Sequence, residues 1–338
     1  MSRDLQGVSV APPPSRIEIL AQTPPGPLPI VVCYALLCII WGTTWAAIQI
    51  GLEGIPPFSG AALRFAVAAV VLLLLAGVLG VRLGTSRRER VLWLVNGALS
   101  FTLTYGVVYW SEQWVPSALA SVLFATYPLF MGVLAHLFLP SEPMRLLEAF
   151  GILAGFGGVA VIFSEDLSSL GGAEVTTAAL VMLISPLTAA ISSVIVKRWG
   201  HGVHPFSLTG VPMAIAAGVL GALALATERD HSFTWNATSV AAILYLAIFG
   251  SAVTFTLYYW LLSHLPAKRM ALIAYVIPVV AILIGVMRGE PLTSRVLLGS
   301  IIVIIGVALS IHRPHNRRPP DPGHPEDSPA RGNASPLL

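Results

Sequence analysis

Long apolar stretches alternate with short polar breaks along most of the chain. One helical crossing of a bilayer takes about 20 predominantly apolar residues, and ten stretches come close to that length. They lie near residues 29–51, 57–80, 91–111, 116–139, 146–164, 175–197, 205–227, 238–262, 267–287 and 292–312. Charged residues, proline and glycine fill the breaks, as in "VRLGTSRRER" and "HLPAKR". The pattern predicts an all-α integral membrane protein with ten transmembrane helices.

The composition excludes a water-soluble protein. Of the 338 residues, 56% are hydrophobic and 10% are charged, whereas a soluble domain carries about 25% charged residues. The two cysteines, Cys33 and Cys38, fall inside the first apolar stretch and face different directions on a helix, so we interpret them as small buried hydrophobic residues. Residues 1–28 and 313–338 are rich in proline and polar residues, and we expect both segments to be disordered tails.

Basic residues collect in alternate breaks. Loops that carry lysine and arginine stay on the cytoplasmic side of a membrane. The basic loops hold Arg82, Arg87, Arg88, Arg90, Arg145, Lys197, Arg198, Lys268 and Arg269. The intervening loops are mostly acidic. This bias predicts that the basic loops and both termini are cytoplasmic.

The chain repeats itself. "VVYWSEQWVPSALA" returns 150 positions later as "LYYWLLSHLPAKRM", and "SEPM" returns as "GEPL". The pattern divides the chain into a first repeat over residues 29–165 and a second over 174–312. Each repeat holds five stretches, and five is odd, so the second repeat enters the membrane inverted. Inverted repeats are typical of secondary transporters, whose substrate site lies near the midplane where the repeats meet.

Several of these segments resemble the EamA family of the drug/metabolite transporter superfamily. The matching pieces are "WGTTWAAIQIGLEGIPPFSGAALRF", "ATYPLF", the "SEP" and "GEP" triplets, and the closing "GVAVIF" and "GVALSI". The resemblance implies a ten-helix carrier of the bacterial inner membrane for amino acids, other metabolites or drugs, often an exporter. Substrates differ widely within that family, so the resemblance names none.

The first stretch carries a candidate wall of a substrate path. Trp41, Thr44 and Trp45, together with Ile48, lie on one face of a helix. They indicate a cavity wall with aromatic faces and a hydroxyl. The alternative is interfacial tryptophan combined with small-residue packing.

Two polar stripes occupy corresponding places in the two repeats. Asn96, Ser100 and Thr104 are spaced four apart in one stretch, and Thr254 and Tyr258 continue a similar stripe from Ser251 in another. Thr104 and Thr254 are equivalent positions, which favours a pair of hydroxyls facing a shared cavity. The stripes are equally typical of hydroxyls that bond to their own helix and of an asparagine that joins helices.

Proline and glutamate mark the later stretches. Tyr127 precedes Pro128, and Tyr275 lies shortly before Pro278, so both tyrosines border a helix kink that suits either gating or packing. Glu142 and Glu290 stand where the fifth and tenth stretches begin. Glutamate there favours the helix dipole, so we interpret both as helix caps, with a symmetric gate contact as the alternative.

Arg64 lies inside the second apolar stretch, where an unpaired charge costs several kcal/mol. Its side chain either snorkels to the interface or binds a substrate carboxylate, with Glu53 as its partner in the empty protein. The equivalent position in the second repeat is Pro212. A charge present in only one repeat favours the substrate or gate role.

We therefore expect a secondary transporter of small organic metabolites in a bacterial inner membrane, with amino-acid export by alternating access as the first hypothesis. Its expected partners are a small-molecule substrate and the lipid bilayer, with no cofactor, no metal and no nucleic acid. A membrane-embedded enzyme or a non-transporting subunit of an assembly is the alternative, but an enzyme would need clustered His, Asp or Glu within the apolar stretches. Because no carboxylate lies at the middle of a stretch, facilitated diffusion or exchange is expected rather than tight proton coupling.

Overall fold

The computed structural model describes residues 26–311, except residues 82, 85, 165, 166, 171, 271 and 272. This part of the chain is helical and contains no strand. The first half contains α2 (Pro27–Leu52), α3 (Pro57–Val78), α4 (Arg87–Asn96), η1 (Gly97–Leu103), α5 (Thr104–Ser111), α6 (Ser117–Phe124), α7 (Tyr127–Phe138) and α8 (Leu146–Phe163). After the short turn η2 (Leu167–Leu170), the second half contains α9 (Glu174–Met182), α10 (Ile184–Trp199), α11 (Pro205–Thr227), α12 (Ala237–Ala247), η3 (Ile248–Val253), α13 (Thr254–His264), α14 (Ala267–Met270), α15 (Ile273–Met287) and α16 (Ser294–Ile311). The predicted disordered tails lie outside the described residues, apart from the start of α2.

Eight helical segments in the described part are long and apolar enough to cross a membrane. They are Pro27–Leu52, Pro57–Val78, Arg87–Ser111, Ser117–Phe138, Leu146–Phe163, Glu174–Trp199, Pro205–Thr227 and Ala237–His264. The predicted all-α membrane class is confirmed. The last two apolar helices, Val276–Met287 and Ser294–Gly306, are shorter. Ten transmembrane helices therefore remain a prediction, of which the described residues support eight.

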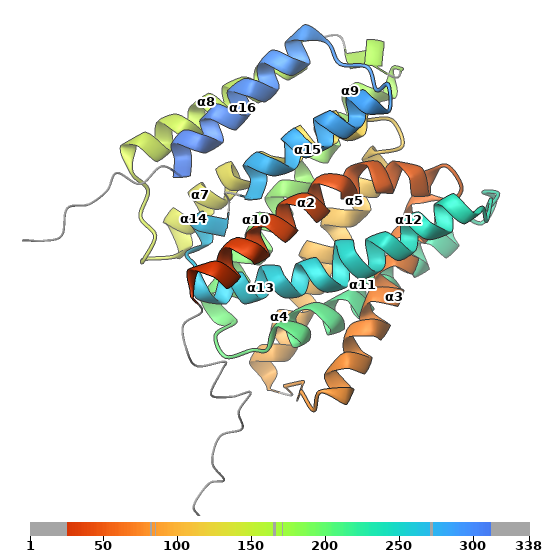
Figure 1. The fold of residues 1–338 in the computed structure, drawn as a ribbon, viewed down its shortest axis with the longest axis vertical. Coiled ribbons are helices and arrows are strands. Elements are labelled where there is room, and N and C mark those ends of the chain that lie inside the picture. The colour runs from red at the N-terminus through yellow and green to blue at the C-terminus, as the bar shows by residue number, and fades with distance from the viewer. Residues whose placement is uncertain are drawn as a thin grey trace, which may run out of the picture.

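The helices of the two halves pack against each other in matched pairs. α3 lies along α11, and α8 lies along α16, so corresponding helices meet. α15 packs on α2, and α10 packs on α7, which is the same contact with the halves exchanged. Figure 1 shows α2 beside α15 and α8 beside α16. This exchange of partners is what two halves related by a twofold axis would produce.

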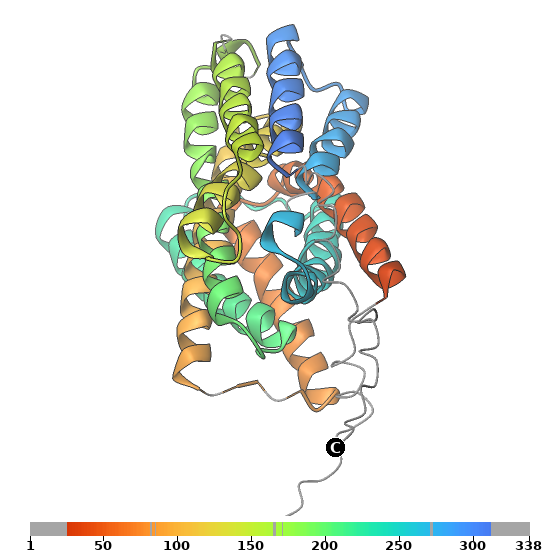
Figure 2. The same ribbon diagram turned by 90° about the vertical axis from the view of Figure 1, so that its left-hand side faces the viewer.

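α8 and α16 approach each other through glycine. In both views they run side by side (Figures 1 and 2). A Cβ atom added to Gly158 would lie 2.7 Å from the backbone nitrogen of Val303 and 2.8 Å from the carbonyl oxygen of Gly299. Only glycine permits so close an approach of two backbones, as at small-residue interfaces in membranes.

Two π-helices interrupt the long helices at corresponding places. η1 follows α4 in the first half, and η3 follows α12 in the second. A π-helix widens the turn and frees backbone carbonyls, and such segments are frequent at functional sites. η1 contributes Ser100 to the cavity described next, and η3 accepts hydrogen bonds from Arg64.

Candidate functional site

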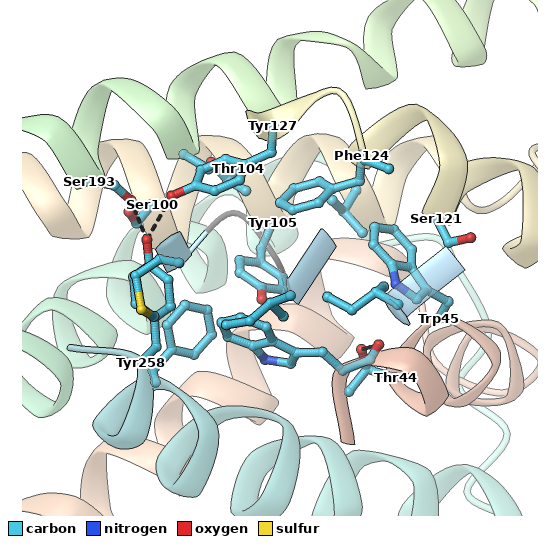
Figure 3. Close-up of a pocket in the computed structure, with 18 of the residues that line it drawn as sticks. Thr44, Trp45, Ser100, Thr104, Tyr105, Ser121, Phe124, Tyr127, Ser193 and Tyr258 are labelled. Carbon is cyan, nitrogen blue, oxygen red and sulfur yellow. Dashed lines mark hydrogen bonds between the residues drawn. The ribbon is translucent and has the colours of Figure 1, made fainter. Parts of the chain in front are cut away.

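A cavity of about 90 Å³ lies between the two halves. Figure 3 shows aromatic rings and hydroxyl groups from both halves converging on it. The first half contributes Trp41, Thr44, Trp45, Ile48, Ser100, Thr104, Tyr105, Val108, Ser121, Phe124, Ala125 and Tyr127. The second half contributes Ala189, Ser193, Phe255, Tyr258, Tyr259, Met270, Ile273, Ile277 and Pro278. The lining is therefore largely apolar and aromatic, with a few hydroxyl groups.

Half of the residues predicted for the site line this cavity. They are Trp41, Thr44, Trp45, Thr104, Tyr127 and Tyr258. Thr254 is fully buried away from the cavity lining, and its hydroxyl has no hydrogen-bond partner among the described residues. The side chain of Tyr275 lies outside the described part of the structure.

Hydroxyl groups connect the halves across the cavity. The hydroxyls of Tyr127 and Tyr258 lie 2.6 Å apart, and Tyr258 also donates to Ser193 Oγ at 3.0 Å (Figure 3). Thr44 donates to the carbonyl oxygen of Trp41 at 2.8 Å, and Thr104 donates to a carbonyl of its own helix. Both threonines therefore line the cavity and also bond to their own backbone, so for Thr104 the two sequence interpretations are compatible.

Asn96 joins helices rather than lining the cavity. It is fully buried, and its Nδ2 donates to the carbonyl oxygen of Leu208 at 2.7 Å. Its Oδ1 accepts hydrogen bonds from Ser192 Oγ at 2.9 Å and from Tyr259 at 2.8 Å. One amide thus ties the end of α4 to α10, α11 and α13.

Arg64 is fully buried behind the cavity wall. Its Nε donates to Ser251 Oγ at 2.7 Å, and its Nη2 donates to the carbonyl oxygen of Gly250 at 2.9 Å, both in η3. Its guanidinium carbon lies 4.6 Å from the centre of the Tyr105 ring, which lines the cavity. Nη1 has no hydrogen-bond partner among the described residues. Snorkelling is wrong for this residue, because a buried guanidinium does not reach the interface.

The partner expected for Arg64 is engaged elsewhere. Glu53 lies 3.7 Å from Nη2 of Arg288, and its side chain is 64% exposed. The predicted Arg64–Glu53 pair is therefore wrong in this conformation. The guanidinium of Arg64 instead donates hydrogen bonds to Ser251 and Gly250 of η3.

Glu142 and Glu290 each cap a helix of the opposite half. Glu290 accepts hydrogen bonds from Ser117 Oγ and, at 3.0 Å, from the backbone nitrogen of Ala118, at the start of α6. Glu142 accepts from the backbone nitrogen of Ala267, at the start of α14, at 3.1 Å. Both glutamates thus cap a helix, but the predicted caps of the fifth and tenth stretches are wrong, because neither bond is to the helix that follows the glutamate. We call these contacts the Glu290 latch (Glu290 with Ser117 and Ala118) and the Glu142 latch (Glu142 with Ala267).

The two latches lie at opposite ends of the bundle. α6 and α7 run from the Glu290 latch at Ser117 toward the loop that holds Glu142. The cavity lies between them, since Ser121 of α6 and Tyr127 of α7 line it.

Glu112 was missed by the sequence analysis. It follows α5 directly and is 3% exposed, and neither carboxylate oxygen has a hydrogen-bond partner among the described residues. The sequence did hold a signal, because the equivalent position in the second half is Leu262. Arg64 is likewise a charged residue whose equivalent position in the second half is uncharged.

No group of three or more His, Cys, Asp or Glu side chains in the described part is placed to hold a metal ion.

Comparison with known proteins identifies the family. Residues 28–164 and 176–311 each match the model of the EamA-like transporter family. The chain belongs to the EamA-like transporter family. The resemblance inferred from the sequence motifs is thereby confirmed, and the chain is a transporter-family membrane protein.

Several relatives of this EamA-like chain are named as transporters. The uncharacterized inner membrane transporter YedA of Escherichia coli K12 is 32% identical over 286 residues, which is 83% of this chain and 90% of YedA. The uncharacterized transporter YoaV of Bacillus subtilis 168 is 24% identical over 80% of this chain and 93% of its own length. The "Probable terminal-alkyne amino-acid exporter" of Streptantibioticus cattleyicolor is 29% identical over 84% of this chain and 93% of its own length.

A solved crystal structure shares the fold of this EamA-like chain. It superposes with a TM-score of 0.65 over 84% of this chain and 97% of the other, at 18% identity. At that identity the match speaks for the fold alone.

Proposed function

We propose that this chain is a secondary carrier that moves small organic metabolites across a bacterial inner membrane by alternating access. In this proposal α14–α15 and α16 complete ten crossings, arranged as two inverted repeats with both termini in the cytoplasm. The two separate matches to the family model support the repeats. The relative YedA, an inner membrane transporter by name, supports the location.

The observation that carries the proposal is a cavity that lies between two latches, each of which joins the two halves. The cavity holds about 90 Å³, whereas pockets that bind metabolites or drugs measure about 300–1,000 Å³. A substrate therefore requires the surrounding helices to separate. Because each latch bonds one half to the other at one end, releasing one latch opens one side while the other stays closed.

The lining favours a small solute without net charge. None of the lining residues in the described part is Asp, Glu, Lys, Arg or His. The rings of Trp41, Trp45 and Phe255 offer apolar faces, and an ammonium group binds well to such rings. The hydroxyls of Tyr127 and Tyr258 offer hydrogen bonds. An amino-acid zwitterion or a derivative combines these features, and the relative named as an amino-acid exporter supports export of this class.

The alternative of a membrane enzyme has less support. Transporter names among the relatives favour a protein that does not change its solute. The hydroxyls of Tyr127, Tyr258 and Ser193 at the cavity are engaged with each other, which suits binding rather than bond cleavage.

Solute exchange in liposomes tests the proposal. Purified protein is reconstituted in vesicles loaded with one unlabelled amino acid, and uptake of the labelled compound is followed for a panel of aromatic, aliphatic and cationic solutes. At least one solute should exchange faster than in empty vesicles. Trp45→Ala in the cavity should slow that exchange, whereas Trp235→Ala, whose side chain is 61% exposed outside the cavity, should not. Absence of exchange across the whole panel, or equal loss in both variants, would count against the proposal.

A further inference from the structure

Glu112 occupies a position that disfavours a negative charge. It directly follows Ser111, the last residue of α5, and its backbone nitrogen donates to the carbonyl of Val108. The carboxyl end of a helix carries a partial negative charge that repels a carboxylate. The side chain is also 3% exposed, with both oxygens lacking a hydrogen-bond partner among the described residues. A buried carboxylate of this kind binds a proton readily.

The groups around Glu112 come from several elements. Glu290, in the loop before α16, and Arg64 of α3 act on it electrostatically, as does Tyr109 of its own helix. Tyr109 packs against Gly60, where an added Cβ would lie 3.3 Å from the ring. Glu174, which starts the neighbouring α9, is exposed.

Glu112 is therefore subject to the charges of both Glu290 and Arg64. Burial, followed by the charge of Glu290, raises the pKa of Glu112 well above its ordinary value of 4.5, and Arg64 works against this rise. Arg64 also donates two hydrogen bonds to η3, so its guanidinium is already engaged away from Glu112.

At the Glu142 end of the bundle, the neighbouring charge is positive, whereas Glu112 beside the Glu290 latch is acidic. Lys197 of α10 donates to the carbonyl oxygens of Leu262 and Leu265, and it lies close enough to Glu142 to interact with its charge. The position equivalent to Lys197 in the first half is Gln49, whose Nε2 donates to the carbonyl oxygen of Val115 at 3.1 Å.

The backbone contacts at the two ends therefore match, but the charges do not. The Glu142 latch has a lysine beside it, and the Glu290 latch has a second carboxyl group. The repulsion between Glu112 and the Glu290 latch disappears when Glu112 is protonated.

We propose that Glu112 is a proton-binding site that controls the Glu290 latch: a proton is bound when that end of the carrier is closed and is released to water when it opens. The inference deepens the proposed function and rests on it, because a proton tied to one latch couples solute movement to the proton gradient. It replaces the expectation of uncoupled transport, which considered only the middles of the apolar stretches. The reaction is the simple exchange of one proton between the Glu112 carboxylate and solvent.

The direction of the pH effect follows from burial. Opening hydrates Glu112 and returns its pKa toward the ordinary value, so the closed form binds the proton more tightly than the open form. Stabilisation of the closed form is then complete below the ordinary value and is lost as the pH rises through the raised pKa. Each unit of difference in pKa between the two forms changes the ratio of open to closed molecules about tenfold.

A single reporter cysteine tests this inference without knowledge of the substrate. Cys33 and Cys38 are replaced by alanine and Ser121 by cysteine, because Ser121 lines the cavity one turn beyond the Glu290 latch. A membrane-impermeant maleimide is added on the Glu290 side of sealed vesicles, from about pH 5 to about pH 9. Labelling at each pH is divided by that of the same protein carrying Glu112→Gln, which cancels the ionisation of the thiol itself.

The expected ratio rises about tenfold or more with pH, because the neutral glutamine keeps the latch closed. Glu53→Gln is the matched control, since this carboxylate is exposed at the same end and should leave the rise intact. Glu112→Leu, which copies the second half, should behave like Glu112→Gln and serves if the glutamine variant does not fold. A ratio that stays constant over the range would overturn the inference.

Solute exchange on the same vesicles separates the two proposals. A pH-dependent ratio without exchange of any solute contradicts the carrier and supports the proton site. Exchange with a constant ratio contradicts the proton site and supports the carrier.

Discussion

Arg64 donates through Nε to the hydroxyl of Ser251 at 2.7 Å, across 187 positions of sequence. This bond fixes α3 of the first half to the π-helix of the second. Because the guanidinium also stands behind Tyr105, it connects the junction of the halves to the cavity wall. The partner of the buried Arg64 charge is therefore Ser251, which lies too far along the sequence for a local pattern to reveal it.

Loss of Arg64 should weaken both folding and transport. We expect Arg64→Ala to lower the free energy of unfolding by about 2–5 kcal/mol, because it leaves a cavity and an unpaired carbonyl at Gly250. Arg64→Lys should retain the charge, lose one of the two donors and give partial exchange. Arg288→Ala is the control, because its pair with Glu53 is exposed and contributes about 0–1 kcal/mol. Thermal unfolding in detergent and liposome exchange measure both effects; equal behaviour of Arg64→Ala and Arg288→Ala would contradict this role.

The features that could be predicted from the sequence are those that depend on local periodicity and composition. The membrane class, most helix positions and six cavity residues could be found because apolar stretches and helical faces are local properties. The partners of Arg64, Glu142 and Glu290 could not, because each partner lies in the other half and depends on how the helices pack. Glu112 was overlooked because its position at the end of a stretch suggests exposure, whereas the structure buries it.

Adjacent glycines in α8 should differ sharply in tolerance. Gly158 faces the backbone of α16, whereas Gly157 has nothing within 4 Å of an added Cβ. Gly158→Leu should force α8 and α16 apart and cost about 1–3 kcal/mol or more of stability. Gly157→Leu should change stability by no more than about 0.5 kcal/mol. Thermal unfolding of the pair measures the difference, and similar losses in both would argue against the close contact.

His204 should make stability depend on pH. Its Nδ1 accepts a hydrogen bond from the backbone nitrogen of Phe206 at the start of α11, and burial lowers its pKa from the ordinary 6.5. A lowered pKa means that stability is full above the ordinary value and is lost as the pH falls through the lowered one. The loss should not exceed the contribution of a cap, about 0.5–2 kcal/mol.

Asparagine at this position provides the comparison. His204→Asn keeps a capping oxygen that does not titrate in this range. The melting temperature of the wild type should therefore fall more steeply than that of the variant as the pH is lowered. Parallel curves would show that His204 does not contribute.

Reporter fusions test the proposed orientation. A reporter active only in the periplasm should be inactive when fused after Gly200, between α10 and α11, and active when fused after Ser232, between α11 and α12. The reason is the positive charge of Lys197 and Arg198 beside the first site. The opposite pattern of activity would reverse the orientation.

Alternation between the two latches is the central claim, and side-specific labelling of the Ser121→Cys reporter tests it most directly. Removing one latch with Glu290→Ala should raise labelling from the Glu290 side alone. Removing the other with Glu142→Ala should raise labelling from the opposite side alone. If both variants raise labelling from the same side, or neither raises it, the account of two latches that open opposite ends is contradicted.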